Sequence, residues 1–284
     1  MRDEPKSNAL GLEEKTAIAT GSAERFGYEW HRYAEMRPEY EEQFRRWTPH
    51  MRPEDWSNLS FVDVGCGMGR NSYWAMSYGA ARGLAIDVDQ RSLAVARRTL
   101  EKYPSVTVRH LSVYDLDPSS SYDVAFSIGV IHHLKDPLAA LRAMVSVVKP
   151  GGRVLIWVYG WENNRWIVYG LTPLRNLLFS RMPISLVHHV SFYPAVLLWL
   201  FLRVSSGGIE YLRLLRQFSF RHIRSIVFDQ MLPKIAHYWS RSEVEQLMHD
   251  AGLINVELGW VNEMSWASIG IRPPENRRRS DEFF

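Results

Sequence analysis

The sequence predicts an α/β protein in which a mostly parallel, seven-stranded sheet lies between two layers of helices. Three observations predict it. Apolar runs that suit buried strands alternate with helix-like segments between residues 60 and 158. A glycine-rich turn follows the first apolar run, and after Trp239 the alternation resumes with one helix and two strands. With 284 residues, 46% of them hydrophobic, the chain can bury a sizeable core.

Local signals predict the individual elements. A helix is expected over 68–78, ended by Gly79. Asp89 can cap a second helix over 91–103. Asp136-Pro137 is typical of a helix start, and that helix is expected to run to 148. Ser240 and Glu243 form a capping box for a helix that closes at Ala251-Gly252, while Lys149–Gly152 is expected to be a turn. The strands are expected at 60–64, 83–87, 106–111, 124–128, 153–158, 255–260 and 265–271.

Two segments predict a nucleoside site. The run Phe61–Gly69 takes a buried strand into a glycine-rich turn, where the backbone can approach a ligand closely. Asp87 ends the next strand, where its carboxylate can accept two hydrogen bonds from a ribose diol. The glycines do not fit a dinucleotide fingerprint, because Arg70 stands where the third glycine should be. Asp63 suits a ligand with an ammonium group better than a pyrophosphate.

At this point the chain resembles the class I methyltransferases that use S-adenosylmethionine. Four segments carry the resemblance in order: Val62–Arg70, Ala85–Asp87, Tyr122–Leu134 and Val147–Leu155. The resemblance implies a Rossmann-like methyltransferase fold with an antiparallel last strand, and S-adenosylmethionine as the cofactor. In that family an acid after the third strand often contacts adenine, and here Ser112 takes its place.

The resemblance also implies the cofactor contacts. The segment before the first strand covers the cofactor in that family, which makes its aromatic residues Phe26, Tyr28, Trp30 and Tyr33 candidates for a lid. The expected cofactor-binding residues are Asp63, Gly65, Cys66, Gly67, Asp87, Val88, Ser112, Val113, Tyr114, Ser127, Tyr28 and Trp30.

Methyl transfer to a hydroxyl needs a base, and histidine suits that role. His132 and His133 follow the fourth strand at the edge where ligands bind, and His237 lies near the second block. The competing interpretation is that the His-His pair packs or hydrogen-bonds the backbone. Tyr159, Tyr238 and Trp199 are the expected substrate contacts. The sequence shows no H-E-x-x-H or carboxylate cluster, so we expect no metal and a metal-independent transfer.

An insertion of some eighty residues separates the fifth strand from the helix after Trp239. Within it, Met182–Leu202 contains no Asp, Glu, Lys or Arg, whereas residues 161–230 as a whole carry eight arginines against three acids. Three interpretations compete: a transmembrane helix, which His188, His189 and Pro194 disfavour; a substrate-binding cap with buried apolar residues; and a cap that also touches a bilayer. Methyltransferases of polyprenyl-quinone and surface-glycan biosynthesis look similar here.

These patterns divide the chain into six expected segments. They are a flexible N-terminal tail (1–20), an N-terminal helical lid (21–57), a cofactor-binding core (58–159), a helical cap insertion (160–235), the end of the core (236–273) and a basic tail (274–284).

Composition limits the partners. The net charge of +3 does not indicate nucleic-acid binding, and a single cysteine, Cys66, suits a reducing compartment. The N-terminus lacks the pattern of a secretory signal, so we expect a cytoplasmic protein, with peripheral membrane contact through 182–202 left open. The expected function is metal-independent methyl transfer to a small-molecule, sugar or lipid-linked acceptor, at oxygen. The alternative is a non-catalytic module that binds S-adenosylmethionine.

Overall fold

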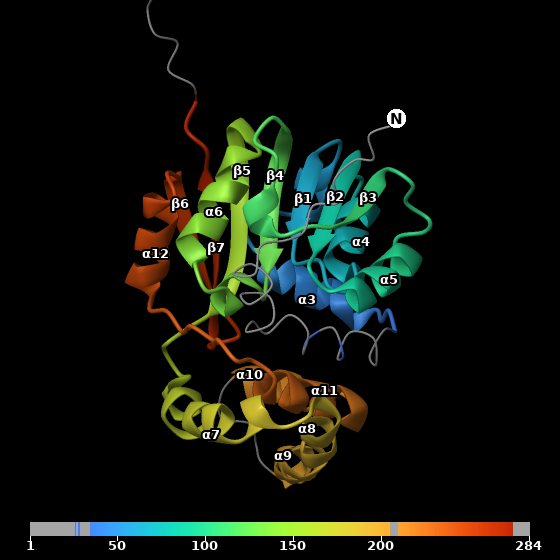
Figure 1. The fold of residues 1–284 in the computed structure, drawn as a ribbon, viewed down its shortest axis with the longest axis vertical. Coiled ribbons are helices and arrows are strands. Elements are labelled where there is room, and N and C mark those ends of the chain that lie inside the picture. Colours follow the sequence, from blue (N-terminus) through green and yellow to red (C-terminus); the bar gives the residue numbers. More distant parts are fainter. Residues whose placement is uncertain (1–25, 27, 29–34, 205–209, 275–284) are drawn as a thin grey trace, which may run out of the picture.

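The computed structural model describes residues 26, 28, 35–204 and 210–274, and its centre is one seven-stranded sheet (Figure 1). The strand order is β3-β2-β1-β4-β5-β7-β6, and β7 runs antiparallel to both of its neighbours. This confirms the predicted fold class and the antiparallel last strand. The strands are β1 (Ser60–Val64), β2 (Arg82–Asp87), β3 (Val106–His110), β4 (Tyr122–Ile128), β5 (Val148–Tyr159), β6 (Ile254–Val261) and β7 (Ser265–Ile271).

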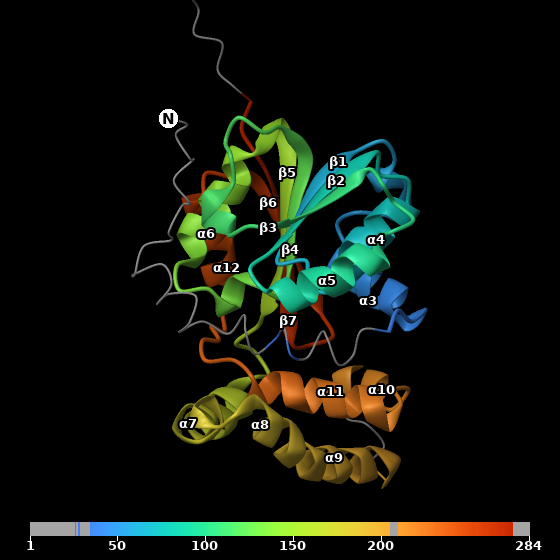
Figure 2. The ribbon, with the colours of Figure 1, turned by 45° about the vertical axis from the view of Figure 1, so that its right-hand side comes forward.

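Helices cover both faces of the sheet (Figures 1 and 2). One face packs against α6 (Pro137–Ser146) and α12 (Arg241–Asp250), and the other against α3 (Glu39–Trp47), α4 (Arg70–Ser77) and α5 (Gln90–Thr99). Successive side chains of a strand point to opposite faces. Ala125 therefore joins the cluster beneath α6 and α12, while its neighbours Val124 and Phe126 join the cluster beneath α3 and α4.

The predicted caps are confirmed. The Asp89 carboxylate accepts hydrogen bonds from the backbone N–H groups of Arg91 and Ser92, and Asp136 accepts one from Ala139. Ser240 and Glu243 form the capping box of α12. Three-residue signals of this kind satisfy the free N–H groups of a helix start locally, which is why they can be recognised from sequence.

One local expectation is wrong. Lys149–Gly152 is not a separate turn, because β5 already begins at Val148, which pairs with Tyr122. The pairing shifts register before Arg153 pairs with Val124, so the extra residues form an irregularity within the strand. Gly151, at φ 81°, supplies the left-handed backbone conformation.

The insertion forms a layer of helices beneath the edge where β1, β2, β4 and β5 end (Figures 1 and 2). We call this layer the cap. The chain leaves the core at Tyr159–Trp161 and returns beside it, since Trp239 N–H donates to the Tyr159 carbonyl and Trp161 N–H to the Trp239 carbonyl. The cap helices are α7 (Thr172–Leu177), α8 (Ile184–Val190), α9 (Phe192–Val204), α10 (Glu210–Leu215) and α11 (Phe220–Met231).

Short helical turns complete the described structure. The 3₁₀ turns are η1 (Pro53–Trp56), η2 (Val113–Asp115), η3 (Ile131–His133) and η5 (Phe179–Arg181), and η4 (Ile167–Leu171) is a π-helical turn. The six predicted segment boundaries stay predictions. The two terminal tails, apart from residue 274, lie outside the described residues.

Candidate functional site

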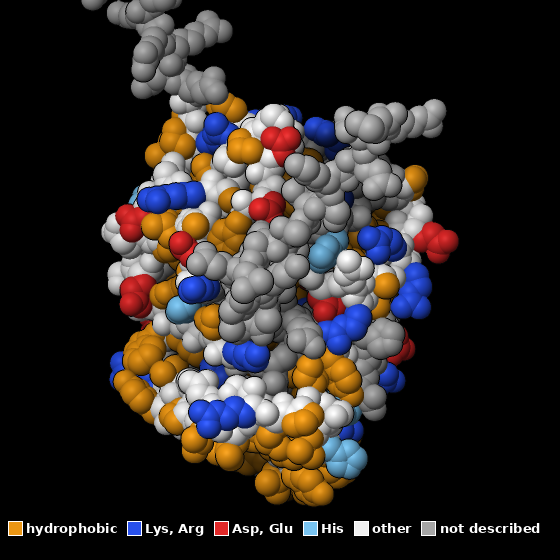
Figure 3. All heavy atoms as spheres, in the orientation of Figure 1, with side chains coloured by type: hydrophobic (Ala, Val, Ile, Leu, Met, Phe, Trp, Pro, Cys, Tyr) orange, Lys and Arg blue, Asp and Glu red, His pale blue; other side chains and the backbone are white. Residues whose placement is uncertain are grey.

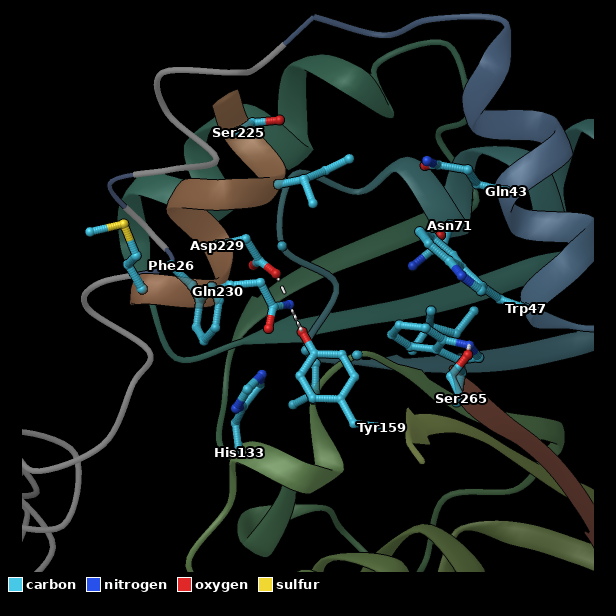
Figure 4. Close-up of a pocket in the computed structure, with 18 of the residues that line it drawn as sticks. Phe26, Gln43, Trp47, Asn71, His133, Tyr159, Ser225, Asp229, Gln230 and Ser265 are labelled. Carbon is cyan, nitrogen blue, oxygen red and sulfur yellow. Dashed lines mark hydrogen bonds between the residues drawn. The ribbon is translucent and has the colours of Figure 1, made fainter. Parts of the chain in front are cut away.

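A cavity of about 1090 Å³ lies between the sheet edge, α3 and the cap (Figure 4). Its walls come from the glycine-rich turn, the ends of the parallel strands, one side of α3, and the inward side of the cap. Most of the lining is apolar, with a small number of polar groups. A pocket of this kind at the carboxyl edge of a parallel sheet is the expected ligand site of an open α/β fold.

The glycine-rich turn is held against the end of β2 by short hydrogen bonds. Backbone N–H groups of Gly65 and Cys66 both donate to the Ile86 carbonyl at 2.9 Å, and the Gly67 N–H donates to Asp87 Oδ2 at 2.9 Å. Gly65 has φ 72°, and a Cβ there would come within 2.4 Å of Val130. The turn can therefore take this path only with glycine at position 65.

Asp87 lies on the cavity wall, where the sequence places it. Its Oδ1 accepts from the Asp89 N–H at 2.9 Å, and burial raises the pKa of its carboxyl while these backbone N–H groups oppose the rise. The backbone N–H groups do not use all of the about four acceptor positions of a carboxylate, so acceptor capacity remains for a ligand.

Asp63 and Ser127 do not line the cavity, whereas Cys66 does. Asp63 is fully buried behind the turn and does not line the cavity; its Oδ2 accepts from the Ser72 hydroxyl at 2.7 Å. Burial raises its pKa to about 7, which does not suit a direct partner for an ammonium group. The Ser127 hydroxyl is likewise buried and donates to the Val64 carbonyl. Cys66 does line the cavity, and burial raises the pKa of its thiol, so it is an inert small residue.

Two amides that the sequence analysis missed face the cavity. Gln43 lies on α3 and Asn71 in the first turn of α4 (Figure 4). Gln43 Oε1 and Asn71 Oδ1 are buried and find no hydrogen-bond partner within the described part of the chain. A buried acceptor without a donor is costly, so both oxygens fit a ligand that brings N–H groups, such as an ammonium group. Asp63 Oδ1 is also without a partner in the described part of the chain, but Asp63 does not line the cavity.

The remaining predicted cofactor residues follow the ends of β2 and β3. Val88, Ser112, Val113 and Tyr114 all line the cavity. Ser112 begins the turn η2 and accepts a hydrogen bond from the Tyr114 N–H, and the Tyr114 hydroxyl donates to the Asp136 carbonyl at 3.1 Å. Tyr114 is exposed, whereas Val113 is buried, so this corner of the cavity is partly open.

The three candidate histidines differ in their position relative to the cavity. His133 lines the cavity, whereas His132 is fully buried behind it, with its ring centroid 3.9 Å from that of Tyr159. Neither ring nitrogen of His132 has a hydrogen-bond partner among the described residues. His237 does not line the cavity; its ring stacks on Trp239 and its Nε2 lies 3.2 Å from the Leu134 carbonyl. The structure thus leaves His133 as the one of the three that a substrate can reach.

His133 is held in one tautomer. Its Nδ1 lies 2.7 Å from the Ile235 carbonyl, an acceptor, so the proton sits on Nδ1 and Nε2 keeps its lone pair. The pKa of His133 is lowered to about 4, mainly by burial and to a smaller extent by the Arg175 guanidinium, while the hydrogen bond to Ile235 opposes the shift. The ring is therefore neutral at physiological pH.

Two polar side chains of the cap bond Tyr159, whose ring lies 5.6 Å from that of His133. The hydroxyl of Tyr159, at the end of β5, lies 3.3 Å from Asp229 Oδ2 and 3.3 Å from Gln230 Nε2, both on α11 (Figure 4). Burial raises the pKa of Tyr159 well above its ordinary value, so the phenol stays protonated and donates to Asp229. The sequence analysis missed Asp229 and Gln230; Asp229 stood out only as one of the few acids of the insertion.

The other predicted contacts lie in different places. Tyr238 lines the cavity, stacked on Tyr159 at 5.5 Å between ring centroids. Trp199 does not line it: the indole packs inside the cap against Phe220, and its neighbour Leu198 faces the cavity instead. Tyr28 packs against Phe228 in the cap and also lies away from the cavity wall.

The N-terminal lid is only partly described. Phe26 lines the cavity 4.9 Å from the His133 ring. Trp30 and Tyr33 lie outside the described residues. Within residues 26, 28, 35–204 and 210–274, no three His, Cys, Asp or Glu side chains are grouped in a way that could hold a metal ion.

Comparison with known proteins gives the class. Residues 62–156 match the family described as a methyltransferase domain. The 1,6-didemethyltoxoflavin-N1-methyltransferase of Burkholderia thailandensis has the same fold, with a TM-score of 0.54 and 12% identity over 95% of this chain and 93% of that one. The chain therefore carries a class I, Rossmann-like methyltransferase domain of the S-adenosylmethionine-dependent kind, as the sequence motifs indicate.

The curated relatives include two enzymes that each match less than half of this chain. A tRNA U34 carboxymethyltransferase of Shewanella sp. (strain ANA-3) is 28% identical over 45% of this chain and 44% of its own length. A ubiquinone biosynthesis O-methyltransferase of Pseudomonas savastanoi pv. phaseolicola is 34% identical over 41% of this chain and 52% of its own length. The chain thus spans about half or less of the length of these relatives, and their acceptors differ in kind.

Proposed function

We propose that this protein transfers the methyl group of S-adenosylmethionine to a hydroxyl oxygen of a small-molecule, sugar or lipid-linked acceptor, without a metal. The observation that carries the proposal is one continuous cavity. At one end lie Asp87, the glycine-rich turn and two unpartnered amide oxygens, and at the other His133 and the Tyr159–Asp229 pair.

The cofactor end fits the parts of S-adenosylmethionine. Asp87 offers acceptors to a ribose diol, Gln43 and Asn71 offer amide oxygens to the ammonium group, and Ser112–Tyr114 form a wall for the base. When bound, the cofactor supplies a methyl group that its sulfonium already activates. The protein then has to align the acceptor with that methyl and exclude water.

The acceptor end fits a hydroxyl. His133 presents the lone pair of Nε2 to the cavity, because its Nδ1 proton is committed to Ile235, and it can take the hydroxyl proton during attack. The Tyr159 hydroxyl, fixed by Asp229 and Gln230, helps to orient the acceptor beside His133, since the two rings lie 5.6 Å apart. The ubiquinone-biosynthesis relative, an O-methyltransferase by name, supports oxygen as the target atom.

The test is methyl transfer from methyl-tritiated S-adenosylmethionine into three separate fractions of a producing strain: extracted lipids, soluble small molecules and tRNA. We expect label in the lipid or the small-molecule fraction, and about tenfold to a hundredfold less with the Asp87→Ala variant at limiting S-adenosylmethionine. Label in tRNA alone would overturn the proposed acceptor class and favour chemistry nearer to that of the Shewanella relative. Cofactor binding with no label in any fraction would favour the non-catalytic module.

A further inference from the structure

The outward side of the cap is apolar and exposed. Its helices α8 and α9 form a nearly continuous stretch, Ile184–Val204, which is long and apolar enough to cross a membrane by length and composition, yet only 22% of it is buried. Figure 3 shows hydrophobic side chains gathered over the cap end of the molecule. We call this surface the outer cap face; its exposed residues are Leu177, Leu178, Leu186, Phe192, Tyr193, Leu197, Leu200, Phe201 and Val204.

The two sides of this stretch have different environments. Val187, Ser191, Ala195 and Leu202 are buried, and they recur at helical spacing on the side that faces the rest of the cap, where α9 packs along α11. The opposite strip is solvent-exposed: Leu197 keeps 69% and Val204 86% of its accessible surface. A helix with apolar residues on all sides is normally buried on all sides, so the outer strip lacks a partner within the described chain.

Charge around the face indicates the kind of partner. The sequence has no Asp or Glu between Glu162 and Glu210, while Arg181 and Arg203, at the two ends of the α8–α9 stretch, are exposed. An apolar strip flanked by arginines complements a bilayer with anionic headgroups. Pairing of two copies through the same face would instead bring like-charged arginines together.

The outer cap face is continuous with the cavity. Leu174, Pro194 and Leu198 line the cavity from α7 and α9, and Leu174 and Pro194 are themselves exposed. An acceptor with a long apolar tail can thus pass from a bilayer to the methyl-transfer site while its tail stays on apolar side chains.

We propose that the outer cap face docks on an anionic lipid bilayer, with α8 and α9 lying in the plane of the interface, and that the protein takes its acceptor from that membrane. The docking stands on the surface alone, whereas the delivery of an acceptor rests on the proposed function. A membrane-spanning orientation of α8 and α9 is disfavoured, because it would separate the buried side of α9 from α11 and from the cap interior.

The test is co-sedimentation of the full chain with vesicles of phosphatidylcholine, with and without phosphatidylglycerol, at low salt. We expect binding to the mixed vesicles, weakened at least about tenfold in Leu197→Glu/Phe201→Glu, because two apolar side chains no longer enter the interface. Arg203→Glu should weaken binding about fivefold, and only where phosphatidylglycerol is present. The matched control is Ile254→Glu, an exposed apolar residue of β6, which should bind as the wild type does.

Thermal unfolding and S-adenosylhomocysteine binding of each variant check that the fold is intact. Absence of wild-type binding at low salt, or equal binding of the double variant, would overturn the docking. A third outcome would also overturn the docking: the wild type is a dimer, the double variant is a monomer, and neither protein binds vesicles. The outer cap face would then be a subunit interface. Vesicle binding requires no methyl transfer, so failure of the proposed function leaves this result unaffected.

Discussion

Asp87 Oδ2 accepts a hydrogen bond from the backbone N–H of Gly67 at 2.9 Å, which joins the end of β2 to the glycine-rich turn after β1. One carboxylate thus both fixes the turn and faces the cavity. A change at Asp87 therefore alters two parts of the cavity wall at once, the turn and the end of β2.

The first prediction follows from that link. Asp87→Ala removes the acceptor of a ribose diol and releases Gly67, and should weaken S-adenosylmethionine binding about tenfold to a hundredfold in equilibrium dialysis. Asp115→Ala, which removes a carboxylate at another position of the cavity wall, is the control and should bind normally. Unchanged affinity of Asp87→Ala would show that the ribose lies elsewhere.

A second prediction concerns stability at Gly83. A Cβ there would lie 2.3 Å from the Phe61 ring, which is fully buried under α4, so neither group has room to move. Gly83→Ala should lower the free energy of unfolding by about 1–3 kcal/mol in urea denaturation. Gly170→Ala, with no atom within 4 Å of the new Cβ, should be neutral; equal effects of the two changes would refute the steric account.

The third prediction separates the adjacent histidines. His133→Phe removes the proposed base and should reduce kcat about a hundred- to ten-thousandfold with S-adenosylhomocysteine affinity retained. His132→Phe makes the same change behind the cavity wall and should keep most of kcat. Because the pKa of His133 is lowered to about 4, wild-type kcat should stay flat from about pH 8 to about pH 6. A larger loss in His132→Phe would contradict the assignment.

A fourth prediction is an acid-dependent loss of stability through His222. Burial lowers its pKa to about 4, with Arg70 and Arg37 adding to the shift. Between about pH 6.5 and about pH 4 the unfolded chain binds a proton at this residue that the folded chain does not, so stability falls as the pH falls through that window. His222 contributes a slope of up to about 1.4 kcal/mol per pH unit.

His222→Gln removes that contribution. The variant should show a smaller drop in urea midpoint than the wild type between about pH 7 and about pH 5. The pKa of Asp63 is raised to about 7, so its contribution to the pH dependence of stability has the opposite sign. This contribution is the same in the variant and the wild type, and it cancels when the two proteins are compared. Identical pH profiles would mean that His222 is protonated in the folded state as readily as in the unfolded chain.

The sequence predicted those parts of the fold whose physical causes are local. The caps at Asp89, Asp136 and Ser240 involve partners within three residues, and the glycine-rich turn needs its positive φ at Gly65 whatever surrounds it. The strand through Lys149–Gly152 was missed, because the pairing of Val148 with Tyr122 depends on a neighbour that proline and glycine signals do not reveal.

The candidate site was predicted less completely, because it is assembled from distant elements. Motif spacing placed Asp87 and His133 on the cavity wall, but it could not distinguish His133 from the buried His132. The two residues are neighbours in one 3₁₀ turn, and only the folded structure shows which of them points into the cavity. Gln43 and Asp229 belong to no motif; α3 and α11 bring them to the site only in the folded chain.

A calorimetric titration of the wild-type protein with S-adenosylhomocysteine decides whether the cavity binds the methyl donor. The site described above predicts saturable binding at one site per chain, and no binding of a nicotinamide dinucleotide in a parallel titration. Absence of S-adenosylhomocysteine binding, or preference for the dinucleotide, would contradict the account.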